Sequence, residues 1–141
     1  SYIRFDLDGN KLEFVNCGHV PPLHFVKTAG TCSILESPNM PLGLSDREEY
    51  RQKSFPFEPG DVFLLYSDGV TECRNEAGEF FGEERLKEVV QTWNHLDPQE
   101  LVRKIQALLV SFVGNDQWRD DLTMVAVAVR DGAEKNKTSQ V

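Results

Sequence analysis

Two acidic positions could perform chemistry, because each adjoins an apolar run with the length of a β-strand. Asp68 follows the run Val62–Tyr66 after one serine, and Asp120 and Asp121 come just before the run 122–129. If the two runs are antiparallel neighbours in a sheet, the end of the first lies at the same edge as the start of the second. We therefore expect the carboxylates of Asp68 and Asp120 to converge at one edge.

Converging carboxylates repel one another, and one of their pKa values rises unless a cation neutralises them. Oxygen ligands suit Mg²⁺ or Mn²⁺, and two such ions about 4 Å apart can generate a hydroxide that attacks a phosphoryl group. The sequence has no G-x-S-x-G elbow, Walker loop or H-E-x-x-H motif, which agrees with a reaction that needs no protein nucleophile. The residue pattern alone leaves an ordinary alternative, in which Asp68 is a turn residue before Gly69 and Asp120 a loop residue.

The elements that would position these acids are a set of strands and two helices. Alternating or continuous apolar residues predict strands at 2–6, 11–17, 23–26, 33–35, 49–57, 62–66 and 123–129, with an Asp-Gly-Asn hairpin turn at 8–10. The strands at 62–66 and 123–129 are apolar throughout, which predicts burial on both faces. Apolar residues at helical spacing predict one helix through Leu86–Trp93, and Asp97-Pro98 predicts the capped start of a second.

Composition limits the class of protein. A chain of 141 residues with 40% hydrophobic side chains predicts one domain, at 1–131, followed by a polar and disordered tail at 132–141. A net charge of -8 argues against nucleic acid as a partner, and no apolar run is long enough to span a membrane. Three cysteines without C-x-x-C spacing favour a reducing compartment, so we expect a cytoplasmic protein. Zinc binding by the set Cys17, His19, His24 and Cys32 is a minor alternative, because its spacing matches no paired-ligand pattern.

Five motifs follow one another along the chain: Asn16-Cys17-Gly18-His19-Val20-Pro21-Pro22; Pro41-Leu42-Gly43-Leu44; Pro59-Gly60-Asp61 continuing through the strand to Ser67-Asp68-Gly69-Val70-Thr71-Glu72; Phe81-Gly82 with Arg85-Leu86; and Asp120-Asp121-Leu122-Thr123. In this order they resemble the motifs of the stage II sporulation E type branch of the metal-dependent (PPM) protein phosphatases. The resemblance extends from about residue 2 to residue 130. It implies an α+β fold, an antiparallel β-sandwich flanked by helices in the α/β/β/α arrangement.

By this resemblance, Asp68 and Asp120 match two metal-binding acids of the family, with Mn²⁺ or Mg²⁺ as the cofactor. Asp121 is interpreted as a turn residue or as a residue behind the metal ligands, Glu72 as a structural partner near Gly69, and His19 as part of a turn that ends a strand. Family members place another metal-binding Asp, followed by Gly, in an N-terminal part that precedes the hairpin at residue 2. The chain lacks that part, so the resemblance implies the C-terminal portion of the domain.

The function implied by the resemblance is hydrolysis of phosphoserine or phosphothreonine on a bacterial regulatory protein, such as an anti-anti-sigma factor, by metal-activated water. A non-catalytic, phosphatase-like interaction module is the alternative, and a generic α+β domain with surface acids is a third. Sheet edges left uncovered by the absent part predict homo-oligomerisation.

Overall fold

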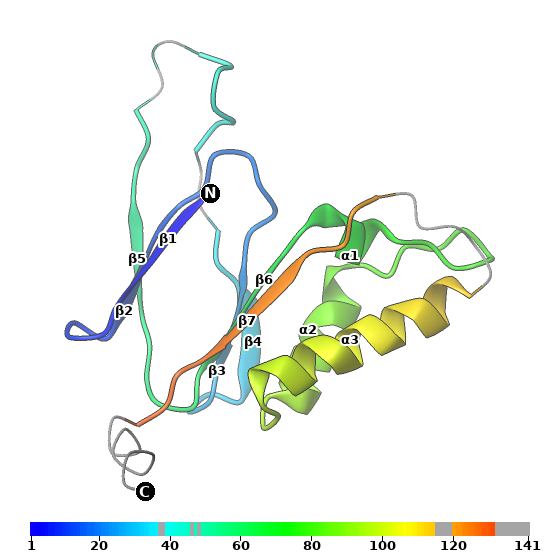
Figure 1. Cartoon of the computed structure of the whole chain (residues 1–141). Coiled ribbons are helices and arrows are strands. Elements are labelled where there is room, and N and C mark those ends of the chain that lie inside the picture. The colour runs from blue at the N-terminus through cyan, green and yellow to red at the C-terminus, as the bar shows by residue number, and fades with distance from the viewer. Residues whose placement is uncertain (37–38, 46, 48, 115–119, 132–141) are drawn as a thin grey trace, which may run out of the picture.

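The computed structural model describes residues 1–36, 39–45, 47, 49–114 and 120–131, which form two antiparallel sheets and a layer of helices (Figure 1). The first sheet has the order β1-β2-β5, and the second has the order β4-β3-β6-β7. The elements are β1 (Tyr2–Asp6), β2 (Lys11–Val15), β3 (Leu23–Val26), β4 (Thr31–Ile34), β5 (Lys53–Pro56), β6 (Val62–Tyr66), α1 (Asp68–Glu72), α2 (Glu83–Trp93), α3 (Pro98–Val113) and β7 (Met124–Ala128). The predicted α+β sandwich is confirmed.

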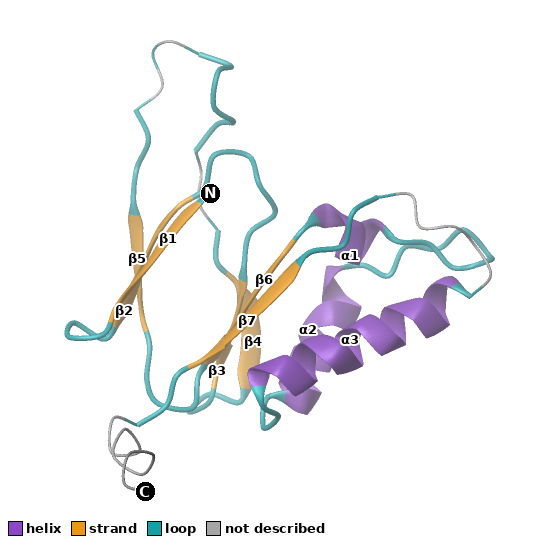
Figure 2. Ribbon diagram, in the orientation of Figure 1, coloured by secondary structure: helices purple, strands orange, loops and turns teal. Residues whose placement is uncertain are grey.

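The helices cover only one face of the second sheet, as Figure 2 shows. Helix α3 packs against β7, and α2 packs against β4 and β3. The opposite face of this sheet packs against the first sheet through a second apolar cluster, which includes Leu12, Phe14 and Phe63. The resulting layer order is sheet, sheet, helices, with one core in each interface. No described helix has both the length and the apolar composition of a membrane span.

Strand β6 contributes to both cores, which explains its uninterrupted apolar sequence. Val62, Leu64 and Tyr66 belong to the core under the helices, whereas Phe63 belongs to the core between the sheets. Successive side chains of a strand point to opposite faces, so a strand with both faces covered has no position for a polar residue. The burial predicted for this strand is therefore confirmed.

Helices α2 and α3 form where the sequence predicts them. In α3, the Asp97 side chain caps the helix by accepting a 3.0 Å hydrogen bond from the backbone N–H of Gln99, and Pro98 occupies the first turn, where no N–H is needed. Leu101, Ile105 and Leu109 repeat at helical spacing and are buried against the sheet.

A buried carboxylate, that of Asp61, stabilises the end of the second sheet that lies opposite Asp68. Asp61, 1% exposed, precedes β6 and accepts hydrogen bonds from the backbone N–H of Lys27 at 2.9 Å and of Glu58 at 3.1 Å. The ring of His24 lies 2.9 Å away through Nε2 and stacks on Phe63. Asp61 thus joins the β3–β4 hairpin to the turn that opens β6, at the opposite end from Asp68.

Besides shifts of one or two residues at strand ends, the structure differs from the sequence predictions at three places. Strand β7 is only partly buried: Ala126 and Val127 pack against the cores on its two faces, but Val125 is 50% exposed. The strand expected at 49–57 is shorter, covering Lys53–Pro56. Helix α1 was not predicted, and Asp68 is its first residue rather than a turn residue. The predicted disordered tail at 132–141 lies outside the described residues.

Candidate metal centre

The pairing of β6 with β7 determines where the two predicted acids lie. The strands are antiparallel, with Tyr66 opposite Met124. The backbone N–H of Ser67 donates to the Thr123 carbonyl at 3.0 Å, which extends the pairing one residue beyond the strands. The segment after β6 and the segment before β7 therefore leave the sheet at the same edge, as predicted from the sequence.

The two segments touch through a glycine. A Cβ atom added at Gly69 would lie 2.5 Å from the carbonyl oxygen of Asp121 and 3.5 Å from Cβ of Asp120. No real side chain tolerates the shorter distance, so Gly69 is required here by close approach and not by its backbone angles. Asp68, one residue before this contact, is thereby held next to the segment that carries Asp120.

Both aspartates are exposed, and the described residues give each carboxylate one hydrogen bond. Asp68 is exposed, and its Oδ1 accepts a 3.0 Å hydrogen bond from the backbone N–H of Gly69. Asp120 is also exposed, and its Oδ1 accepts a 2.8 Å bond from the N–H of Asp121. Each carboxylate has a second oxygen and further lone pairs with which it can bind a cation.

Helix α1 fixes the backbone of Asp68. Gly69, Val70 and Thr71, which belong to this helix, are buried, and the Thr71 hydroxyl donates to the Asp68 carbonyl at 3.3 Å. Since its next three residues are anchored in the protein, the Asp68 side chain is presented from a fixed base.

The donor chemistry of this site fits a hard divalent cation. Two exposed carboxylates on adjoining segments offer oxygen ligands, which Mg²⁺ and Mn²⁺ prefer. Within the described ranges, no group of three or more His, Cys, Asp or Glu side chains is placed to hold a metal ion. Mg²⁺ commonly binds through one or two carboxylates while it keeps several waters, so two acids suffice for a hydrated ion.

The other candidate residues have structural partners. His19 closes a turn after β2, in which Asn16 Oδ1 accepts from the His19 N–H at 3.0 Å and Asn16 Nδ2 donates to the His19 carbonyl at 2.6 Å. Asp121 contacts the site through its backbone, and Glu72 ends α1 on the surface. The minor zinc alternative is wrong, because Cys17, His19, His24 and Cys32 form no metal-binding group and His24 is paired with Asp61.

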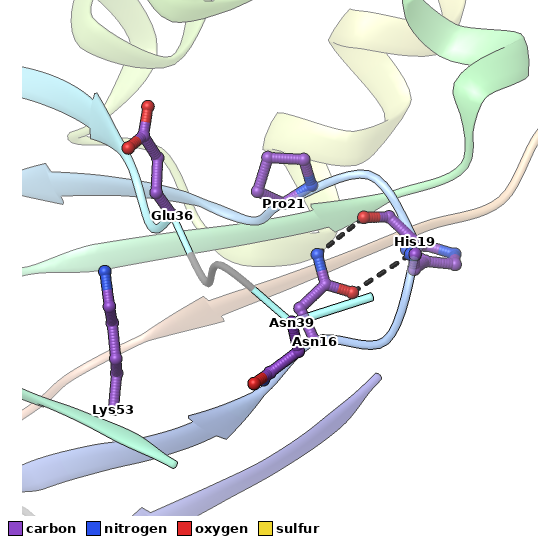
Figure 3. A pocket seen from close by; sticks show the side chains of 7 residues that line it. Asn16, His19, Pro21, Glu36, Asn39 and Lys53 are labelled. Carbon is purple, nitrogen blue, oxygen red and sulfur yellow. Dashed lines mark hydrogen bonds between the residues drawn. The ribbon is translucent and has the colours of Figure 1, made fainter. Parts of the chain in front are cut away.

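A cavity opens between the ends of the two sheets (Figure 3). Its volume is about 410 Å³, and it is lined by Asn16, Gly18, His19, Pro21, Glu36, Asn39 and Lys53. The lining comes from the segment after β2, the segment after β4 and the first residue of β5. Because β3 begins beside the end of β6, these segments lie at the same end of the sandwich as Asp68. The sequence singled out the Asn16 and His19 motif but not Glu36, Asn39 or Lys53, which lie in separate stretches.

The comparison with known families agrees with this geometry. The sequence model of the stage II sporulation protein E (SpoIIE) family matches residues 1–130. The chain belongs to the SpoIIE family. Phosphoserine phosphatase RsbU of Bacillus subtilis is 30% identical over 126 residues, which are 89% of this chain and 37% of RsbU. Protein IcfG of Synechocystis is 30% identical over 122 residues, which are 86% of this chain and 19% of IcfG.

Solved structures show where the SpoIIE-family chain fits in the fold. The SiaA-PP2C domain of Pseudomonas aeruginosa superposes with a TM-score of 0.78 at 23% identity, over 89% of this chain and 49% of that domain. A structure of SpoIIE from Bacillus subtilis, containing its PP2C phosphatase domain and part of its regulatory domain, gives a TM-score of 0.71 at 21% identity, over 89% and 37% of the two chains. The chain thus has the fold of the C-terminal part of a PP2C phosphatase domain and spans about half or less of these relatives.

Proposed function

We propose that this chain is the C-terminal part, over residues 1–131, of a metal-dependent protein serine/threonine phosphatase domain. The observation that carries the proposal is the β6–β7 pairing, which brings the segments of Asp68 and Asp120 into contact at one edge of the sheet. The name of its relative RsbU, a phosphoserine phosphatase, supports the reaction class. The substrate we propose is phosphoserine or phosphothreonine on a bacterial regulatory protein such as an anti-anti-sigma factor.

In this proposal Asp68 and Asp120 hold Mn²⁺ or Mg²⁺ through their solvent-facing carboxylate oxygens. Such an ion, when bound, supplies an activated water and charge stabilisation for a phosphoryl group. The protein contributes placement: α1 fixes the backbone of Asp68, and the contact at Gly69 fixes its separation from the Asp120 segment. Both acids are exposed at the end of the sandwich, so a phosphorylated side chain on another protein can reach them.

Self-association belongs to the proposal as well. Strands β1 and β7 are edge strands of the described sheets, and each exposes a large apolar residue, with Tyr2 59% and Val125 50% exposed. Uncovered edges with apolar side chains favour pairing with a second chain. Light scattering on the chain of 141 residues should show a dimer or larger species, and a well-folded monomer would count against self-association.

The test of the proposed function is Mn²⁺-dependent release of phosphate from a phosphoserine protein by the full-length gene product. Asp68→Asn and Asp120→Asn should each lower the rate by about 100-fold or more, because an amide replaces a charged ligand in each. Asp8→Asn, an exposed acid in the β1–β2 turn, is the matched control and should leave the rate unchanged. Equal rates in the parent and both site variants would remove the metal assignment.

A non-catalytic interaction module remains the second candidate. It is favoured by one observation, namely that the described residues provide two exposed acids but no third metal-binding side chain beside them. This candidate predicts that the full-length gene product binds Mn²⁺ without releasing phosphate. The rate measurement above separates the two functions.

A further inference from the structure

Ser67 occupies an unusual place, because the chain changes from strand to helix at this residue. Its backbone N–H still pairs with the Thr123 carbonyl, as in a strand. Its carbonyl instead accepts a 3.0 Å bond from the N–H of Val70, as at the start of a helix. In an antiparallel sheet, two directly opposed, hydrogen-bonded residues exchange both N–H···O bonds. Ser67 can make only one of them with its backbone, since its carbonyl has turned toward α1.

The Ser67 hydroxyl takes over the missing bond. The backbone N–H of Thr123 donates to Ser67 Oγ at 3.0 Å, in place of the Ser67 carbonyl. The same hydroxyl donates to the Asp121 carbonyl at 2.9 Å. A serine side chain commonly caps a helix that begins after it, but Ser67 makes no such bond to α1. Its hydrogen-bonding capacity is directed across to the other segment.

We propose that Ser67 is a positioning residue for the metal centre. Its hydroxyl lets the chain leave the sheet directly before Asp68 while keeping the segment of Asp120 in register. The hydroxyl is suited to this because one short side chain provides both a donor and an acceptor. Alanine at this position would leave the Thr123 N–H and the Asp121 carbonyl without their partner, so the two acids would lose their fixed separation. This inference rests on the proposed function, because it assigns the two acids to one ion.

The experiment compares Ser67→Ala with Ser67→Thr in the full-length gene product. Mn²⁺ affinity is measured by isothermal titration calorimetry, and exchange of the Thr123 amide is measured by NMR without metal. We expect Ser67→Ala to bind Mn²⁺ about tenfold more weakly, the size expected when two hydrogen bonds are lost, and to exchange Thr123 faster. Ser67→Thr keeps the hydroxyl and should restore both properties. Thr92→Ala removes a hydroxyl bonded to the Glu88 carbonyl on α2 and should change neither.

The outcomes separate this inference from the proposed function. Parent-like Mn²⁺ affinity and Thr123 exchange in Ser67→Ala would overturn the positioning role while leaving the metal assignment intact. If Ser67→Ala does not fold, Ser67→Thr decides the matter, since weakened Mn²⁺ binding in a folded threonine variant would overturn the role. A parent protein that binds no Mn²⁺ would overturn both the proposed function and the positioning role. Thr123 exchange would then report only on the hydrogen bond from its N–H to Ser67 Oγ.

Discussion

Replacing Gly69 with alanine should disturb the metal centre through a backbone contact, without touching either acid. The added Cβ would lie 2.5 Å from the Asp121 carbonyl oxygen, which must move by about 0.9 Å to reach an ordinary contact of 3.4 Å. Such overpacking costs about 1–3 kcal/mol, and loss of the Ser67 hydroxyl bond to the same carbonyl adds about 1 kcal/mol. Alanine in a helix returns about 1 kcal/mol relative to glycine. The free energy of unfolding should therefore fall by about 2 kcal/mol.

The assay is urea unfolding combined with Mn²⁺ titration, and Gly78→Ala provides the control. Gly78 has a φ of +79° and no atom near its added Cβ, so alanine there costs only the left-handed conformation, about 1–2 kcal/mol. Both variants should lose a similar amount of stability, but only Gly69→Ala should lose Mn²⁺ affinity. A Gly69→Ala protein that is more stable than the parent by about 1 kcal/mol would refute the close approach, because helix propensity would then be the only effect.

Two further predictions concern other parts of the fold. Asp61→Ala should lower the free energy of unfolding by about 2–4 kcal/mol, since two backbone N–H groups and His24 lose their acceptor. Mn²⁺ affinity should stay unchanged, because Asp61 lies at the other end of β6; weaker binding would contradict that separation. Burial raises the pKa of the Cys32 thiol to about 12, from 9.0 when unperturbed. Because the unfolded thiol ionises first, its contribution to stability is complete below pH 9 and is lost as the pH rises toward 12. Urea unfolding should show that the free energy of unfolding falls more between pH 8 and pH 10.5 in the parent than in Cys32→Ala. Equal losses of stability would argue against burial as the cause of the raised pKa.

The sequence predicts strand and helix identity well where the pattern reflects local geometry. Strand β6 is apolar at every position because each face meets a different core, and α3 begins at Asp97-Pro98 because both residues suit a helix start. The convergence of the Asp68 and Asp120 segments required only the assumption that two apolar strands are antiparallel neighbours. That assumption is confirmed by the pairing of β6 with β7.

Other features could not be predicted because they depend on tertiary contacts. Helix α1 has five residues with glycine in second place, a poor helix by propensity, and it is held by burial of Gly69, Val70 and Thr71. Val125 is exposed although Val127, on the same face of β7, packs against the core between the sheets, a difference that an apolar sequence does not reveal. The role of the Ser67 hydroxyl depends on atoms of residues more than fifty positions away.

The central claim is that Asp68 and Asp120 bind the same cation, and a double-mutant cycle on Mn²⁺ affinity tests it most directly. Titration calorimetry would compare the full-length gene product with Asp68→Asn, Asp120→Asn and the double variant. Two ligands of one ion should be strongly coupled. The double variant should therefore lose much less Mn²⁺ binding free energy than the sum of the losses in the two single variants. Two losses that simply add, or Mn²⁺ affinity unchanged in either single variant, would contradict the shared site.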